Sequence, residues 1–187
     1  MLVRLLGRWA LVAGLKGARV GEPAELIKAL RAREELKRVV FQLADARMVA
    51  GPEHLLVAAL SALRAFEMEM NVASDLGLEV LTFASGQRQI SRAIELMGLK
   101  PGSSEVAVLI LGSSPQELEV AFSAIAEELG GERDDSVLEV DEEKAGELAE
   151  VFGISRAELD ACRRLGEFPE VVKALVLERV ALSVAYR

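Results

Sequence analysis

The apolar run VAVLIL at residues 106–111 constrains the fold of this chain more than any other segment. It has the length of a strand and contains no polar residue, which predicts a central strand buried on both faces. The sequence SPQE follows at residues 114–117. It combines an N-cap serine, a proline at the first helical position and a glutamate at the third, so a helix should start there.

Other segments extend this alternation of strands and helices. Apolar and β-branched runs predict further strands at 9–18, 39–43, 78–83 and 137–140, and residues 45–49 can extend the second of them. Helical spacing and capping residues predict helices at 23–38, 51–70, 114–129 and 171–185, and another that ends at Gly98. Residues 141–187 are expected to form a helical C-terminal part. We therefore predict one α/β or α+β domain over residues 1–187, with a central sheet of about four strands packed with several helices.

The charge balance limits how this chain could contact nucleic acid. It has 22 lysine and arginine residues against 30 aspartate and glutamate residues, for a formal net charge of −8. Nucleic-acid binding over the whole surface is not expected from such a balance, so any RNA contact must be local.

Cysteine, histidine and apolar runs exclude several other classes. The single cysteine allows no internal disulfide, and the single histidine excludes a multi-histidine metal site, so no cofactor or metal is predicted. No run reaches the roughly 20 apolar residues of a membrane span, and residues 1–15 lack the long apolar stretch of a signal peptide. We expect no membrane contact and a cytoplasmic location.

Signatures of common enzyme classes are absent from the sequence. It contains no phosphate-binding loop ending in Lys-Ser/Thr, no dinucleotide fingerprint after a strand and no nucleophile elbow. Nucleophilic catalysis would need Cys162 or a serine beside His54. Cys162 has the character of a small buried side chain, and a hydrolase or transferase that uses Cys162 with His54 is kept as one hypothesis.

The segment SGQRQISR at residues 85–92 predicts an anion site. Gly86 leads into a helix whose first N–H groups lack internal partners, and Arg88 and Arg92, four positions apart, would share one face of it. Helix N-termini favour phosphate, and paired arginines add charge-assisted hydrogen bonds. The alternative is an ordinary capped helix whose arginines pair with glutamates.

Three polar residues share one side of the otherwise apolar helix at 51–70. His54, Ser61 and Arg64 fall within about a quarter of its circumference. His54 is either a hydrogen-bonded structural residue or a contact to a base or ribose. Convergence of His54, Arg64 and Arg88 would favour nucleic-acid binding.

Two helices carry apolar residues whose placement can be tested. In the last helix, Val172, Leu175, Val176 and Val180 either belong to the core or form a groove for a partner protein. Ile94 is assigned to the buried side of its own helix. The substitution Ile94→Asp is therefore expected to unfold the protein, because an unpaired charge in a core is destabilising.

The stretch VAGPEHLLVAALSALRAFEMEMNVASDLGLEVLTFASGQRQISRAIELMGL at residues 49–99 resembles the CGI-type subunit of KEOPS, the complex that makes threonylcarbamoyladenosine in tRNA. Its specific features are the His-Leu-Leu triplet, the turn at Asn71, the Leu-Glu-Val segment and the Ser-Gly-x-Arg-Gln-Ile-Ser motif. FGIS at 152–155 and VLERVAL at 176–182 are similar to C-terminal features of archaeal members. The resemblance covers most of the chain beyond about residue 39.

This resemblance implies a non-catalytic subunit that docks on the small atypical kinase of KEOPS and stimulates it. It also implies binding of tRNA through the unpaired 3′ CCA end, and so an indirect link to the threonylcarbamoyl transferase subunit. The motif and the residues expected near it give the candidate tRNA site Ser85, Gly86, Arg88, Gln89, Arg92, His54 and Arg64. A second hypothesis is a protein-interaction adaptor that regulates a kinase without RNA contact.

Overall fold

The structure is a computed structural model that describes residues 1–183. Its centre is a sheet in which four strands lie in the order β1-β2-β4-β3, with every neighbouring pair antiparallel, and a short fifth strand pairs with the end of β2. The strands are β1 (Leu2–Leu5), β2 (Arg8–Lys16), β3 (Val40–Asp45), β4 (Glu105–Gly112) and β5 (Glu132–Arg133). The predicted class is confirmed as α+β.

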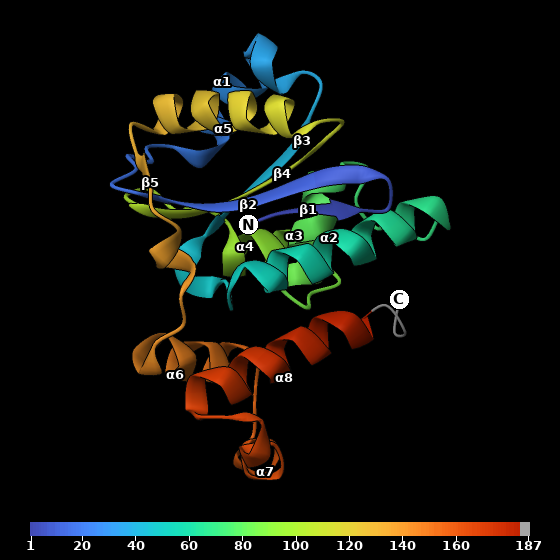
Figure 1. Ribbon diagram of the computed structural model, residues 1–187, viewed down its shortest axis with the longest axis vertical. Helices are drawn as coiled ribbons and strands as arrows, with labels where there is room; N and C mark the ends of the chain where they lie inside the picture. Colours follow the sequence, from blue (N-terminus) through green and yellow to red (C-terminus); the bar gives the residue numbers. More distant parts are fainter. Residues whose placement is uncertain (184–187) are drawn as a thin grey trace.

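Helices cover both faces of the sheet (Figure 1). On one face lie α1 and α5, and on the other lie α2, α3 and α4. The helices of the described residues are α1 (Pro23–Ala32), α2 (Pro52–Glu67), α3 (Leu76–Ala84), α4 (Ile90–Met97), α5 (Pro115–Leu129), α6 (Glu142–Val151), α7 (Arg156–Ala161) and α8 (Phe168–Leu182).

The central strand is β4, as the sequence predicts. It pairs with β2 on one side and β3 on the other, and residues 106–111 are all almost fully buried. Alternate side chains enter different cores, since Val108 and Ile110 pack toward α5 whereas Ala107 and Leu109 pack toward α2, α3 and α4. Two-sided burial therefore explains the unbroken apolar run.

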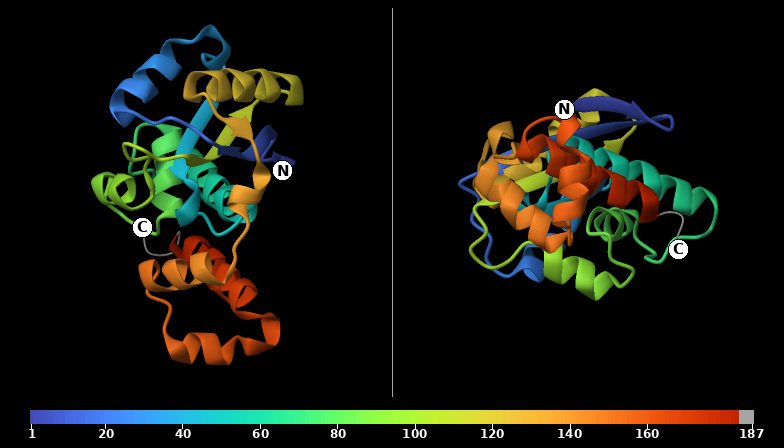
Figure 2. Two further views of the ribbon diagram at one scale, coloured as in Figure 1. Left: turned by 90° about the vertical axis from the view of Figure 1, so that its left-hand side faces the viewer. Right: turned by 90° about the horizontal axis from the view of Figure 1, so that it is seen from below.

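The C-terminal helices form a further layer beyond α2. Figures 1 and 2 show α6, α7 and α8 on the side of α2 that faces away from the sheet. A small core of Ala50, Leu148, Val172 and Val176 joins α8 and α6 to the chain just before α2. The predicted end of the last helix, at residues 184–185, lies outside the described residues.

The four apolar residues singled out in the last helix are enclosed by this packing. Val172, Leu175, Val176 and Val180 expose between 0% and 4% of their surface. They therefore belong to the core in this conformation and offer no groove to a partner protein.

The segment at 78–83 is a helix, α3, so the predicted strand there is wrong. Asp75 caps this helix, because its Oδ1 accepts a hydrogen bond of 3.0 Å from the N–H of Leu78. Nearly every side chain of α3 is buried, including Glu79, whose carboxylate accepts from the N–H groups of Val72 and Ala73. A segment buried all round shows no periodicity that distinguishes a strand from a helix.

Smaller differences concern element boundaries. The N-terminal segment contains two strands, β1 and β2, where one was predicted. The strand extension expected at 45–49 is instead a 3₁₀ turn at Ala46–Met48. The strand expected at 137–140 overlaps a 3₁₀ turn at Asp135–Leu138. The helix that begins at Pro23 ends at Ala32, before the predicted residue 38. Ile94 is 45% exposed, so its assignment to the buried side of α4 is wrong, whereas Ala93 and Met97 are fully buried.

Candidate functional site

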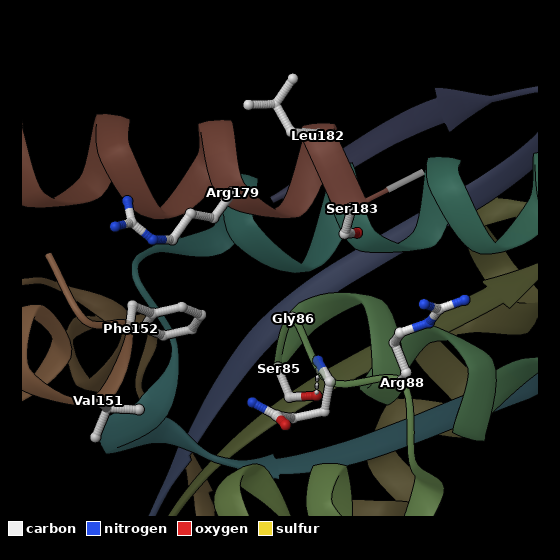
Figure 3. A pocket seen from close by; sticks show the side chains of 9 residues that line it. Ser85, Gly86, Arg88, Val151, Phe152, Arg179, Leu182 and Ser183 are labelled. Carbon is white, nitrogen blue, oxygen red and sulfur yellow. Dashed lines mark hydrogen bonds between the residues drawn. The ribbon is translucent and has the colours of Figure 1, made fainter. Parts of the chain in front are cut away.

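A cavity of about 410 Å³ lies between the loop that joins α3 to α4 and the C-terminal half of α8. Figure 3 shows the loop below the helix, with Phe152 at one end and Arg88 at the other. We call it the 85–88 cavity. Its lining consists of Ser85, Gly86, Gln87, Arg88, Val151, Phe152, Arg179, Leu182 and Ser183.

The loop takes its shape from the way α3 ends. Ser85 is the C-cap, and Gly86 follows with φ of +64°, the left-handed conformation that commonly terminates helices. The Ser85 hydroxyl donates to the carbonyl of Thr82 and accepts from the N–H of Gln87 at 3.3 Å. Gly86 therefore ends a helix rather than a strand, and Ser85 holds the turn together from a buried position.

The two arginines of the predicted fork do not act together. Arg88 precedes α4, which begins at Ile90, so it does not share a helical face with Arg92. The Arg92 guanidinium pairs with Glu95 at 2.9 Å on the surface of α4. The predicted Arg88/Arg92 pair is therefore wrong, and Arg92 follows the alternative of pairing with glutamate.

Among the described residues that line the cavity, Arg88 is the exposed cation. Its side chain forms no ion pair within the described residues and points away from Arg179 at the other end (Figure 3). An exposed arginine without a carboxylate partner keeps its planar set of donors for an external anion.

Sequence reasoning did not assign Arg179 to a site. In the structure its side chain is held by two residues of the C-terminal layer. Its guanidinium donates to Glu158 at 2.9 Å and to the carbonyl of Gly153 at 3.1 Å. Hydrogen bonds from Ser155, together with the bond from Arg179, lower the pKa of Glu158 to about 2. The only sequence signal for Arg179 is its place in the last helix, where it falls at the same helical spacing as the apolar residues.

His54 lies inside the protein and is fully buried. Its Nδ1 accepts from the N–H of Ala50 at 3.0 Å, and its Nε2 lies 2.8 Å from the carbonyl oxygen of Ala84. Burial, the largest cause, lowers its pKa to about 4. His54 is therefore a hydrogen-bonded structural residue and cannot contact a base in this conformation. With both ring nitrogens engaged, it also cannot serve Cys162 as a general base.

The remaining candidates lie outside the lining of the cavity. Gln89 is the exposed N-cap residue of α4, and its side chain makes no capping hydrogen bond. Arg64 is exposed near the C-terminal end of α2, about 15 Å along the helix axis from His54 at 1.5 Å per residue. His54, Arg64 and Arg88 therefore do not converge on one surface.

Among the described residues, no three histidine, cysteine or carboxylate side chains come together as metal ligands. Over the same part of the chain, no helix combines the length and the apolar character that crossing a bilayer requires.

These features define a small α+β protein with a surface cavity. An arginine, a phenyl ring and a glycine-containing loop line this cavity, and such groups are common in binding sites. Residues 18–183 match the family model described as kinase binding protein CGI-121. The chain is also 33% identical over 172 residues to the regulatory protein Cgi121 of Methanocaldococcus jannaschii, an alignment that covers 92% of this chain and 95% of the relative. The chain therefore belongs to the CGI-121 family of kinase-binding proteins.

Proposed function

We propose that this chain is a non-catalytic subunit of the KEOPS tRNA-modification complex that binds and stimulates the small atypical kinase and recruits tRNA by its 3′ CCA end. Membership of a kinase-binding family and a relative described as a regulatory protein support the kinase part of this role. The resemblance of the sequence to KEOPS subunits supports the tRNA part.

The observation that carries the tRNA proposal is the 85–88 cavity. Its volume of about 410 Å³ lies within the roughly 300–1,000 Å³ of typical ligand sites, which suits unpaired nucleotides and not a duplex. Single-stranded RNA is commonly held by base stacking on aromatic rings and by arginines that contact the backbone. Phe152 and Arg88 supply one group of each kind at the two ends of the cavity.

The experiment compares the binding of tRNA with and without its CCA end to the wild-type protein, Arg88→Ala and Arg92→Ala, at two salt concentrations. Arg92 is the matched control, because it is an exposed arginine of the same segment that pairs with Glu95 and does not line the cavity. We expect Arg88→Ala alone to weaken binding, and only for tRNA that carries the CCA end. Loss of one phosphate contact should also reduce the slope of log affinity against log salt by about 0.7.

The opposite result supports the second hypothesis. Suppose that the protein binds the kinase subunit but does not bind tRNA, or binds tRNA with an affinity that neither removal of the CCA end nor Arg88→Ala changes. The protein then acts as a kinase-regulating adaptor without specific RNA contact. Kinase binding and stimulation are measured on the same three proteins, where neither arginine substitution is expected to change them if the 85–88 cavity serves RNA alone.

A further inference from the structure

His54 contacts both sides of the 85–88 cavity without lining it. On one side, its Nε2 lies 2.8 Å from the carbonyl oxygen of Ala84, the last residue of α3, which directly precedes the loop residues Ser85 and Gly86. On the other side, its ring meets the ring of Phe152 edge to face, with centroids 5.7 Å apart. Phe152 follows α6 and belongs to the C-terminal layer.

The partners of His54 fix the position of its proton. The N–H of Ala50 can only donate, so Nδ1 must offer its lone pair to it. The carbonyl oxygen of Ala84 can only accept, so Nε2 must carry the hydrogen. Both ring nitrogens are thereby used, and the ring cannot rotate without breaking a buried hydrogen bond.

The bond to Ala84 also completes the end of α3. The last carbonyl groups of a helix have no partner inside the helix, and those that are buried need one from elsewhere. Ser85 and Gly86 donate their N–H groups to Leu81 and Phe83, and His54 donates to the carbonyl of Ala84. The start of the 85–88 loop is thus tied to α2.

From this geometry we propose that His54 is a positioning residue that sets the 85–88 loop relative to Phe152 and so determines the shape of the cavity that receives RNA. The proposal rests on the proposed function in so far as it concerns RNA. The same ring fixes one wall by a hydrogen bond and meets the other by an aromatic contact, so the two walls move together only while the imidazole is in place.

The test uses His54→Gln and His54→Asn, two amides of the same chemistry and different reach. The side-chain nitrogen of glutamine can occupy the place of Nε2 and donate to Ala84, whereas the shorter asparagine reaches only the place of Nδ1. We expect His54→Asn to lower the affinity for tRNA that carries the CCA end by about tenfold, comparable to removing a partner that orients a metal ligand. His54→Gln should retain most of it.

A second readout does not depend on RNA. Hydrogen exchange of the Gly86 and Gln87 amides, which bond to Phe83 and Ser85, reports the order of the loop directly. We expect faster exchange in His54→Asn than in His54→Gln, with equal exchange in the strands β2 and β4. Denaturant unfolding of both variants shows whether a change is confined to the loop.

The outcomes separate this proposal from the proposed function. If wild-type protein binds no RNA, the proposed function fails, and the exchange rates still decide whether His54 positions the loop. Equal loop exchange in the wild-type, glutamine and asparagine proteins would overturn the positioning role. Unchanged CCA-dependent affinity in His54→Asn, in a wild-type protein that does bind, would overturn its link to RNA.

Discussion

Lowering the pH should destabilise this protein through His54 in a way that can be measured separately from its many carboxylates. Full burial disfavours the imidazolium and is the main reason why the pKa of His54 falls from 6.5 to about 4. The nearby positive charge of Lys144 lowers this pKa further, while the bond to Ala84 opposes the change. Protonation would also place an N–H of the ring against the N–H of Ala50, so the folded state resists it.

The sign and the size of this effect on stability follow from the pKa of His54 in the unfolded chain and its pKa in the folded protein. Below pH 6.5 the unfolded chain binds a proton at His54 that the folded chain refuses until about pH 4, so stability falls as the pH falls. The stability that the buried, neutral His54 contributes is fully present above pH 6.5 and is lost progressively down to about pH 4. A pKa difference of about 2.5, at 1.36 kcal/mol for each unit, gives about 3 kcal/mol between pH 7.5 and pH 4.

The assay is urea unfolding of the wild-type protein and of His54→Phe at a series of pH values. The phenylalanine variant keeps a ring beside Phe152 but does not titrate, so carboxylate effects common to both proteins cancel. The wild-type advantage in unfolding free energy should shrink by about 3 kcal/mol from pH 7.5 to pH 4. A constant difference, or an NMR titration of this single histidine with a midpoint near 6.5 in the folded protein, would refute the argument.

Four further substitutions test other parts of the structure. Gly14→Ala should cost about 3 kcal/mol in denaturant unfolding, because its Cβ would lie 2.3 Å from the carbonyl oxygen of Asp134, whereas Gly146→Ala, with open space around it in α6, should stabilise by about 1 kcal/mol. Ser155→Ala removes the N-cap of α7 and should lower the unfolding free energy by about 1 kcal/mol. Burial lowers the pKa of Lys144 to about 8 from 10.5, so the wild-type protein should gain stability relative to Lys144→Met as the pH rises between these values in calorimetric scans.

Local rules of sequence predicted the elements whose determinants lie close together in the chain. The N-cap expected at Ser114 is present, since its hydroxyl accepts a hydrogen bond from the N–H of Glu117. The central strand was recognisable because burial on both faces leaves an unbroken apolar run. Each of these signals spans fewer than ten residues.

The sequence could not predict features that depend on distant partners. The helix α3 was mistaken for a strand because burial all round erases its periodicity. The role of His54 depends on the carbonyl of Ala84, 30 residues away, and Arg179 is held by Glu158, 21 residues away. Of the predicted site, Ser85, Gly86 and Arg88 do line the cavity, but Phe152 and Arg179 reach it only through the packing of α6 and α8.

The placement of carboxylates explains how an acidic chain can present a surface for an anion. A second cleft of about 460 Å³ contains Lys16, Arg47 and Lys144, but five carboxylates share its lining, namely Glu105, Glu139, Asp141, Glu143 and Glu147. Among residues 1–183, the lining of the 85–88 cavity contains two arginines and no acidic side chain. Interactions between exposed charges weaken beyond a screening length of about 8 Å at physiological salt. An anion in the 85–88 cavity would therefore interact more strongly with the charges next to it than with the net charge of −8 of the whole chain. If the proposed tRNA contact is made at the 85–88 cavity, a phosphate there meets Arg88 without a carboxylate in the described lining to oppose it.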